Sequence, residues 1–115
     1  MMGELNKTKC VSCSEGLPPL AERESEELLK EIPEWVIVSE DGVSRLVRTF
    51  TFENFREAMA FAGSVGELAE SEQHHPKLVT EWGKVRVEWW THAVHGLHMN
   101  DFVMAARTDE LFQEL

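Results

Sequence analysis

The chain has 115 residues, 43% hydrophobic and 28% charged, which is typical of one soluble globular domain with a single core. Its 21 acidic and 11 basic residues give a net charge of −10. This charge repels phosphate backbones and anionic lipid, so we expect neither a nucleic-acid nor a membrane partner. The chain lacks an apolar run of the ~20 residues that a membrane span needs and lacks the apolar core of a signal peptide. We therefore expect a cytoplasmic protein.

Residues 1–20 are expected to form a flexible arm, because glycine and paired prolines interrupt regular structure there. Residues 21–115 then form a single domain. The arm carries both cysteines of the chain, Cys10 and Cys13. No second Cys-x-x-Cys pair follows to complete a four-ligand zinc site, so we favour ordinary thiols over a metal or redox role. A metal site shared with a histidine is the alternative.

The first half of the domain is predicted to be a helix followed by a strand pair. The helix covers residues 21–31, and a proline follows it. Residues 35–39 and 43–52 are predicted strands, joined by the strong hairpin-turn signal Asp41-Gly42.

Alternation along the second strand places Leu46, Phe50 and Phe52 on one face, which we assign to the core. Arg48 falls on the same face. A bulge or an edge position of the strand would explain the arginine, and the sequence does not choose between them.

The longest predicted helix covers residues 53–73. Gly63 and Gly66 lower its helix propensity, so we expect another backbone to approach closely there. The predicted core stripe recurs at helical spacing and consists of Phe55, Ala58, Met59, Ala62, Gly66 and Ala69.

A second hairpin and a last helix complete the chain. The strands are predicted over residues 77–82 and 84–91, around Gly83, and the helix over residues 98–112. In the last strand, the set expected to face the helices is Val85, Val87 and Trp89, and the set expected on the open side is Arg86, Glu88 and Trp90. The element order predicts an α+β two-layer sandwich, with a four-stranded antiparallel sheet and the helices on one face.

Histidines occur where two of these elements end. His74 and His75 precede Pro76, which disfavours helix at the residue before it, so the long helix should end near His74. Thr91-His92 closes the last strand. Imidazole titrates near neutral pH and acts as acid or base. Such groups converging on one pocket suggest proton transfer at both ends of a small substrate.

These residues form a pattern that resembles one enzyme family. The pattern consists of Glu70-x-x-x-His74-His75-Pro76, Thr91-His92, Gly96-Leu97 and Asp101. With it, the chain is similar to the pterin-4a-carbinolamine dehydratases from about residue 17 to the C-terminus. The resemblance implies dehydration of 4a-hydroxytetrahydropterin to quinonoid dihydropterin, in support of tetrahydropterin recycling, with no metal or organic cofactor.

The resemblance also implies roles for individual residues. His74 and His92 are the acid/base pair, and the sequence leaves open which is the acid. His75 acts with them by binding the pterin and its leaving oxygen, while Glu70 and Asp101 orient the imidazoles. The substrate-binding set implied by the resemblance is Gln73, His75, Pro76, Trp90 and Thr91.

Two positions depart from the family pattern. His95 stands where a small residue is usual, and His98 stands where Thr or Ser usually caps the last helix. Histidine is a poorer cap, so we expect a less well-defined start of this helix, which affects Asp101.

Other functions remain as alternatives. His92, His95 and His98 recur at a spacing of three, which suggests a metal-binding module, although no carboxylate or thiolate stands at a familiar ligand offset. Because some family members act as dimerisation partners of transcription regulators and others serve molybdopterin metabolism, a non-enzymatic interaction protein is the second alternative. As an enzyme, the protein is expected to be coupled to an aromatic amino acid hydroxylase.

The long helix also predicts self-association. Phe61, Val65 and Leu68 widen its apolar surface beyond the stripe that one sheet needs. A monomer would leave Phe61 and Leu68 largely in water, and burying each stabilises an interface by about 2 kcal/mol. We predict a homo-oligomer, a dimer or tetramer as the resemblance implies, with Phe61 and Leu68 at a helix-to-helix contact.

Overall fold

The structure is a computed structural model that describes Leu5 and residues 20–115. Cys10, Cys13 and most of the expected arm lie outside these residues. Leu5 itself is buried in the core. Within the described part of the chain, no helix has both the length and the apolar character needed to cross a bilayer. In chain order the elements are α1 (Glu22–Leu29), β1 (Val36–Glu40), β2 (Val43–Thr51), α2 (Phe55–Glu72), β3 (Lys77–Glu81), β4 (Lys84–Trp89), the 3-10 helix η2 (His92–Val94) and α3 (Met99–Gln113).

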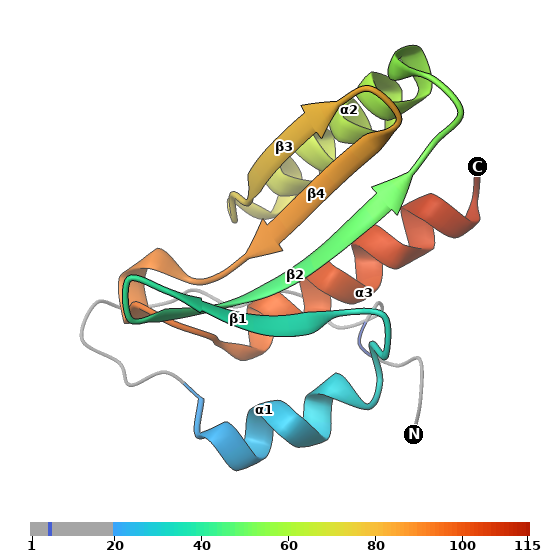
Figure 1. Ribbon diagram of the computed structural model, residues 1–115. Coiled ribbons are helices and arrows are strands. Elements are labelled where there is room, and N and C mark those ends of the chain that lie inside the picture. The colour runs from blue at the N-terminus through green and yellow to red at the C-terminus, as the bar shows by residue number, and fades with distance from the viewer. Residues whose placement is uncertain (1–4, 6–19) are drawn as a thin grey trace.

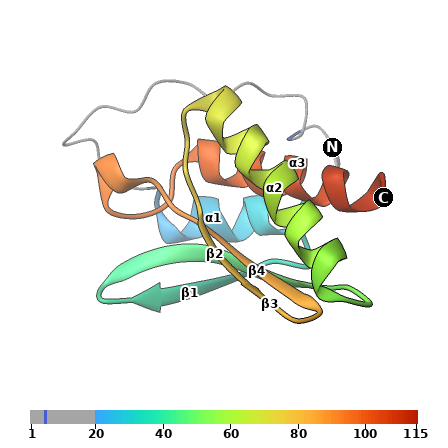
Figure 2. The same cartoon turned by 90° about the horizontal axis from the view of Figure 1, so that it is seen from above.

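The four strands form one antiparallel sheet in the order β1-β2-β4-β3. Figure 1 views the uncovered face of this sheet, and Figure 2 shows that the helices lie on the opposite side. The predicted α+β two-layer fold is confirmed, and each predicted element is present with small shifts at its ends. β2 and β4 lie at the centre of the sheet, so the side chains on their helix-facing sides supply most of the sheet's contribution to the hydrophobic core.

The core stripe of α2 was predicted correctly only in part. Phe55 and Met59 are 46% and 49% exposed. Ala58 and Ala69 of the predicted stripe are buried, and the other buried residues of α2 are Phe61 and Val65. The helix is turned by roughly 70°, somewhat less than one residue, from the predicted orientation. Small residues occur on both stripes, so the apolar period alone did not decide which one faces the sheet.

Phe61 is therefore a core residue. It is 1% exposed, and its ring packs against Phe50, Phe52 and Phe112 at centroid distances of 4.8, 5.3 and 5.8 Å. Leu68 is half-buried and packs against the same core. The prediction that Phe61 lies at a helix-to-helix contact between subunits is wrong, because β2 and α3 already cover it.

Gly63 and Gly66 do not receive a neighbouring backbone within the described chain. Apart from the helix's own nearby backbone, no atom of the described residues lies within 4 Å of the position that a Cβ would take at either glycine. The close approach predicted from these glycines is therefore not made by Leu5 or residues 20–115.

Arg48 needs neither of the explanations that the sequence suggested. β2 is a central strand, and its pairing with β4 runs without a bulge. The side chain stays on the helix side, where Nη1 donates to Asp109 Oδ1 on α3 at 2.6 Å and the guanidinium lies over the Phe50 ring at 4.3 Å. Trp35 Nε1 donates to the same oxygen at 2.8 Å. Burial raises the pKa of Asp109 despite these donors.

In β4 the predicted alternation holds, and Val85, Val87 and Trp89 are fully buried beneath the helices. Glu88 was predicted on the open side and does point there, but only 2% of it is exposed. Burial alone would raise the pKa of Glu88. Hydrogen bonds from Arg86 and Arg45, together with nearby positive charge, outweigh that effect and lower it below the ordinary value of 4.5.

Candidate active site

His74 stands directly after the end of α2. Gln73 takes the left-handed conformation, with φ of 53°, and its backbone N–H closes the helix on Ala69 and Glu70 carbonyls. Pro76 prevents helix from continuing. The predicted end of the helix is confirmed, and the turn at Gln73 sends His74 and His75 in different directions.

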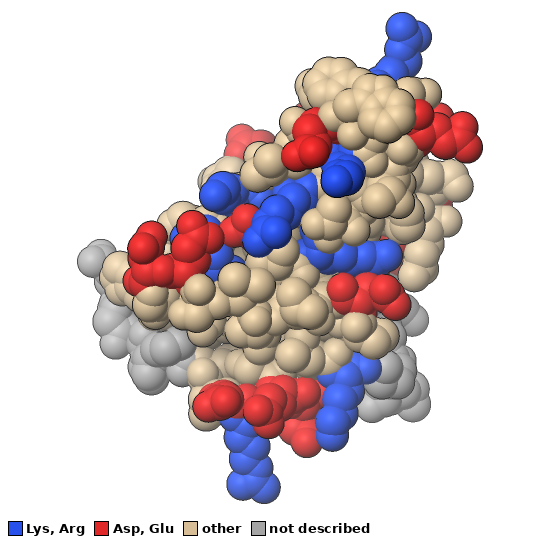
Figure 3. Space-filling model, viewed as in Figure 1, with Lys and Arg blue, Asp and Glu red and all other residues tan. Residues whose placement is uncertain are grey.

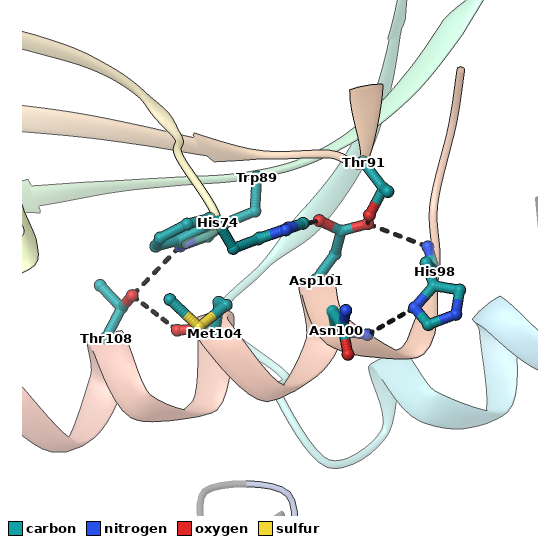
Figure 4. A network of polar contacts seen from close by, with 8 residues as sticks. All are labelled: His74, Trp89, Thr91, His98, Asn100, Asp101, Met104 and Thr108. Atoms are coloured by element: carbon teal, nitrogen blue, oxygen red, sulfur yellow. Dashed lines mark hydrogen bonds and ion pairs between the residues drawn. The ribbon is translucent and has the colours of Figure 1, made fainter. Parts of the chain in front are cut away.

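Asp101 is the centre of the site. It lies in the first turn of α3 and is fully buried. Its Oδ1 lies 2.7 Å from His74 Nε2, and its Oδ2 accepts from Thr91 Oγ1 at 2.7 Å and from the backbone N–H of His98 at 2.9 Å (Figure 4). Because a carboxylate accepts, His74 presents Nε2–H to it. α2, β4 and α3 thus meet at one carboxylate.

The ring of His74 rests on Trp89. The two rings are stacked at a centroid distance of 5.7 Å and an interplanar angle of 13°. Trp89 is held in turn by α3, since its Nε1 donates to Thr108 Oγ1 at 3.1 Å and that hydroxyl donates to the Met104 carbonyl at 2.7 Å (Figure 4). Trp89 was predicted as a core residue, but its contact with the ring of His74 was not predicted. No sequence signal identified Thr108.

The start of α3 is well formed despite the unusual cap. His98 Nδ1 accepts from the backbone N–H of Asn100 at 3.1 Å, and the Asp101 carboxylate accepts from the backbone N–H of His98 at 2.9 Å. Histidine with Nδ1 unprotonated thus does the work that Thr or Ser usually does at an N-cap. The expectation of a poorly defined start is wrong. Asp101 serves both the cap and His74.

Between β4 and α3 the chain makes a short closed loop. Thr91 and Gly96 form an isolated antiparallel bridge, and η2 lies between them. His95 ends η2 with φ of 53°, a left-handed conformation that glycine adopts most easily and that is uncommon for other residues. His92 begins η2 and is exposed, and its ring packs on Trp90 at a centroid distance of 4.7 Å.

His75 lies in different surroundings from its neighbour. It is exposed, and its Nε2 contacts the carboxylate of Glu70, which is also exposed. Gln73 is exposed too, and its side-chain amide donates to the Glu70 carbonyl at 2.9 Å. Pro76 is partly buried.

The structure therefore brings some of the predicted residues together and separates others. His74, Asp101 and Thr91 are in direct contact, and Thr91 directly precedes His92. Glu70 contacts His75 rather than His74. Thr91 was expected to line the substrate pocket, but its side chain is buried and bonded to Asp101. Trp90 is partly buried beside His92.

The described residues do not assemble a metal centre. Among Leu5 and residues 20–115, no group of three or more His, Cys, Asp or Glu side chains is placed to hold an ion. His92, His95 and His98 lie on a short 3-10 turn, at its end and at the cap of α3, so they do not share the face of one helix.

Known proteins are similar to this chain in sequence and in fold. The family model described as Pterin 4 alpha carbinolamine dehydratase matches residues 18–111. The chain belongs to this family of hydro-lyases. A relative from Chlorobium limicola is 57% identical over 112 residues, which are 97% of this chain and 99% of the relative. A relative from Marinobacter nauticus is 50% identical over 111 residues, which are 96% and 100% of the two chains.

Both of these relatives carry the name "Putative pterin-4-alpha-carbinolamine dehydratase". A solved structure described as a transcriptional coactivator/pterin dehydratase from Brucella melitensis has a TM-score of 0.72 at 29% identity, and the match covers 81% of this chain and 97% of that one. The resemblance inferred from the histidine pattern is therefore confirmed at the level of the pterin dehydratase family.

Proposed function

We propose that the protein dehydrates 4a-hydroxytetrahydropterin to quinonoid dihydropterin by histidine acid/base catalysis. The observation that carries this proposal is the buried Asp101 carboxylate, which holds His74 and also contacts Thr91, the residue before His92. Membership of the dehydratase family and the names of the relatives support the substrate class.

The reaction requires two proton movements and no change of oxidation state. The 4a-hydroxyl takes up a proton, the C4a–O bond breaks, and water leaves. A proton leaves N5, and the electron pair of that N–H bond forms the C4a=N5 double bond. One acid and one base placed near these two atoms are therefore sufficient.

Asp101 suits His74 to the role of base. With Nε2–H donated to the carboxylate, the lone pair of neutral His74 is on Nδ1, where it can accept the N5 proton. Asp101 then stabilises the imidazolium that forms. We assign His92 as the acid that protonates the departing hydroxyl, because it stands in solvent and can regain a proton directly.

The exposed residues near the end of α2 are assigned to binding. His75, held by Glu70, offers a hydrogen bond to the pterin and its leaving oxygen. Gln73 and Pro76 border the same corner, and Trp90 offers an aromatic face beside His92 for the planar ring. Thr91 contributes through Asp101 and its backbone.

The direct test is the decay of 4a-carbinolamine, generated by a hydroxylase in a stopped-flow assay, with and without the protein. We expect acceleration by wild type, and loss of most of it in His92→Ala. Wild-type protein that leaves the decay rate unchanged would overturn the proposed activity.

We propose that catalysis needs no metal, because imidazoles supply both proton transfers. Dialysis against a strong chelator should leave the rate unchanged. Loss of activity that zinc restores would instead favour a metal role for His92, His95 and His98.

The protein is proposed to act as a homo-oligomer, with the contact moved from Phe61 to the exposed stripe of α2. Phe55 and Met59 project from this stripe, and Gly63 and Gly66 beside them leave open space. A second copy of α2 would cover these apolar side chains at close range. Light scattering should show a dimer or tetramer that Met59→Glu weakens. A wild-type monomer at tens of micromolar would exclude it.

We also propose a place in tetrahydropterin recycling. An aromatic amino acid hydroxylase would supply the substrate, and a reductase would consume the product. The description of the Brucella structure as a coactivator as well as a dehydratase makes a non-enzymatic interaction role the second candidate. A pull-down with His92→Ala would test whether partner binding is independent of catalysis.

A further inference from the structure

The uncovered face of the sheet carries a buried ion cluster that the proposed chemistry does not use. Glu88 on β4 accepts from Arg45 Nη1 at 3.0 Å and from Arg86 Nε at 2.9 Å, and it is 2% exposed. The Arg45 side chain on β2 is only 12% exposed. Figure 3, seen from this face, shows basic side chains gathered over the middle of the sheet. Burying an ion pair seldom stabilises a fold more than apolar residues would, so its presence suggests another role.

Arg45 is directed at an aromatic ring as well as at Glu88. Its guanidinium carbon lies 4.0 Å from the centre of the Trp90 indole, the distance of a close cation–π contact. Its Nε is buried and has no hydrogen-bond partner in the described structure. The side chain therefore keeps the stacked position at the expense of one hydrogen bond.

Trp90 directly follows β4, which ends at Trp89. In the register of β4 with β2, Trp89 is the last residue with a partner, opposite Leu46, so Trp90 lies beyond the paired part of the sheet. Its indole is instead held by the guanidinium of Arg45. The other ring in contact with this indole is His92, at a centroid distance of 4.7 Å and an angle of 41°.

We propose that Arg45 is a positioning residue for His92 and acts through Trp90. Glu88 fixes the guanidinium, the guanidinium fixes the indole, and the indole supports the exposed imidazole that would otherwise rotate freely in water. The inference rests on the role proposed for His92. The two imidazoles are thus held by different means. His74 is held by the buried carboxylate of Asp101, and His92 by the indole of Trp90, which Arg45 on β2 keeps in place.

The chain offers a matched control for this proposal. Arg48 lies on the same strand, pairs with a carboxylate at 2.6 Å and stacks over an aromatic ring at 4.3 Å, but it faces the helices. Arg45→Met and Arg48→Met remove the same group from equivalent surroundings on opposite faces. Arg45→Lys is the conservative variant, since it keeps a cation for Glu88 and loses the planar stack. Circular dichroism would establish that each variant is folded at the assay temperature.

The first readout is the imidazole signal of His92 in an NMR spectrum, assigned with His92→Gln. Wild-type protein should show the ring-current shift of the Trp90 indole. Arg45→Met should move the signal toward that of free histidine, Arg45→Lys should move it part of the way, and Arg48→Met should leave it unchanged. An unchanged His92 signal in Arg45→Met would overturn the proposal. This readout does not depend on activity, so it is separable from a failure of the proposed function.

The second readout is a double-mutant cycle in the dehydration assay. Arg45→Met should lower kcat by about tenfold, because a misdirected acid costs rate. KM should rise as well, because Trp90 is also proposed to bind the pterin ring. In a His92→Ala background, Arg45→Met should cause no further loss of kcat, because its effect on kcat acts through His92. An equal loss in both backgrounds would show that Arg45 does not act through His92 and would overturn the proposal.

Discussion

Two histidine–carboxylate pairs stand side by side in the chain and differ in almost every physical respect. His74 pairs with Asp101, which is fully buried and comes from another helix. His75 pairs with Glu70, which lies five residues back in the last turn of α2, and the two side chains are 56% and 68% exposed. The first pair is fixed by packing from three elements. The second is a local contact in water.

The comparison shows what burial adds to the same two functional groups. An exposed ion pair is screened by solvent and contributes about 0–1 kcal/mol. At Asp101, water is replaced by the Thr91 hydroxyl and the His98 backbone N–H, so the carboxylate has one arrangement and the imidazole one orientation. We therefore assign proton transfer to His74 and ligand binding to His75.

The largest effect should come from breaking the buried pair. Asp101→Asn turns an acceptor into a donor on one side, so His74 loses its fixed tautomer and its support as imidazolium. We expect kcat to fall by about a hundred- to ten-thousandfold, as in His74→Ala. Stopped-flow decay of 4a-carbinolamine measures it, with far-UV circular dichroism as the control for folding. An Asp101→Asn enzyme within threefold of wild type would contradict the assignment.

Removing the exposed imidazole should act mainly on binding. His75→Ala removes one hydrogen-bonding group from the proposed pterin-binding residues after α2. We expect binding to weaken by about 1.5 kcal/mol, which raises KM roughly tenfold. We expect kcat to change by only a few-fold. Steady-state kinetics over a range of pterin concentrations separates the two parameters. A fall in kcat as large as that of His74→Ala would erase the proposed distinction between the two pairs.

The cap of α3 should contribute stability to the buried pair. His98→Ala removes the acceptor for the Asn100 N–H and should lower the free energy of unfolding by about 1 kcal/mol. His98→Ser supplies a hydroxyl in its place and should remain close to wild type. Urea denaturation of the two variants provides the comparison. Equal losses in both would mean that Nδ1 of His98 does not act as a cap.

The smallest effect should come from the exposed carboxylate. Glu70→Gln keeps the size of the side chain and removes only its charge. Because solvent screens this contact, we expect less than about twofold change in kcat and less than about 0.5 kcal/mol in stability. The same stopped-flow and urea measurements test it. A loss comparable to that of Asp101→Asn would show that exposure does not separate the two pairs.

Much of this architecture was predictable because it depends on local signals. The Asp41-Gly42 turn, the proline after the paired histidines and the alternation of β4 each act over a few residues, and each predicted its element correctly. The orientation of α2 was not predictable in the same way. Its two candidate stripes both contain small and apolar residues, and only packing of Phe61 onto β2 and α3 selected one.

The same division between local and long-range information applies to the candidate site. The order of the elements and the placement of imidazoles at their ends were determined by the sequence itself, since proline and the apolar period act between near neighbours. Helical spacing would put Glu70 beside His74, four residues on. The left-handed turn at Gln73 instead directs His75 to Glu70, and His74 contacts the carboxylate of Asp101, 27 residues away in the sequence. Which acid meets which imidazole was decided by the tertiary structure, because that contact forms only where α2, β4 and α3 pack together.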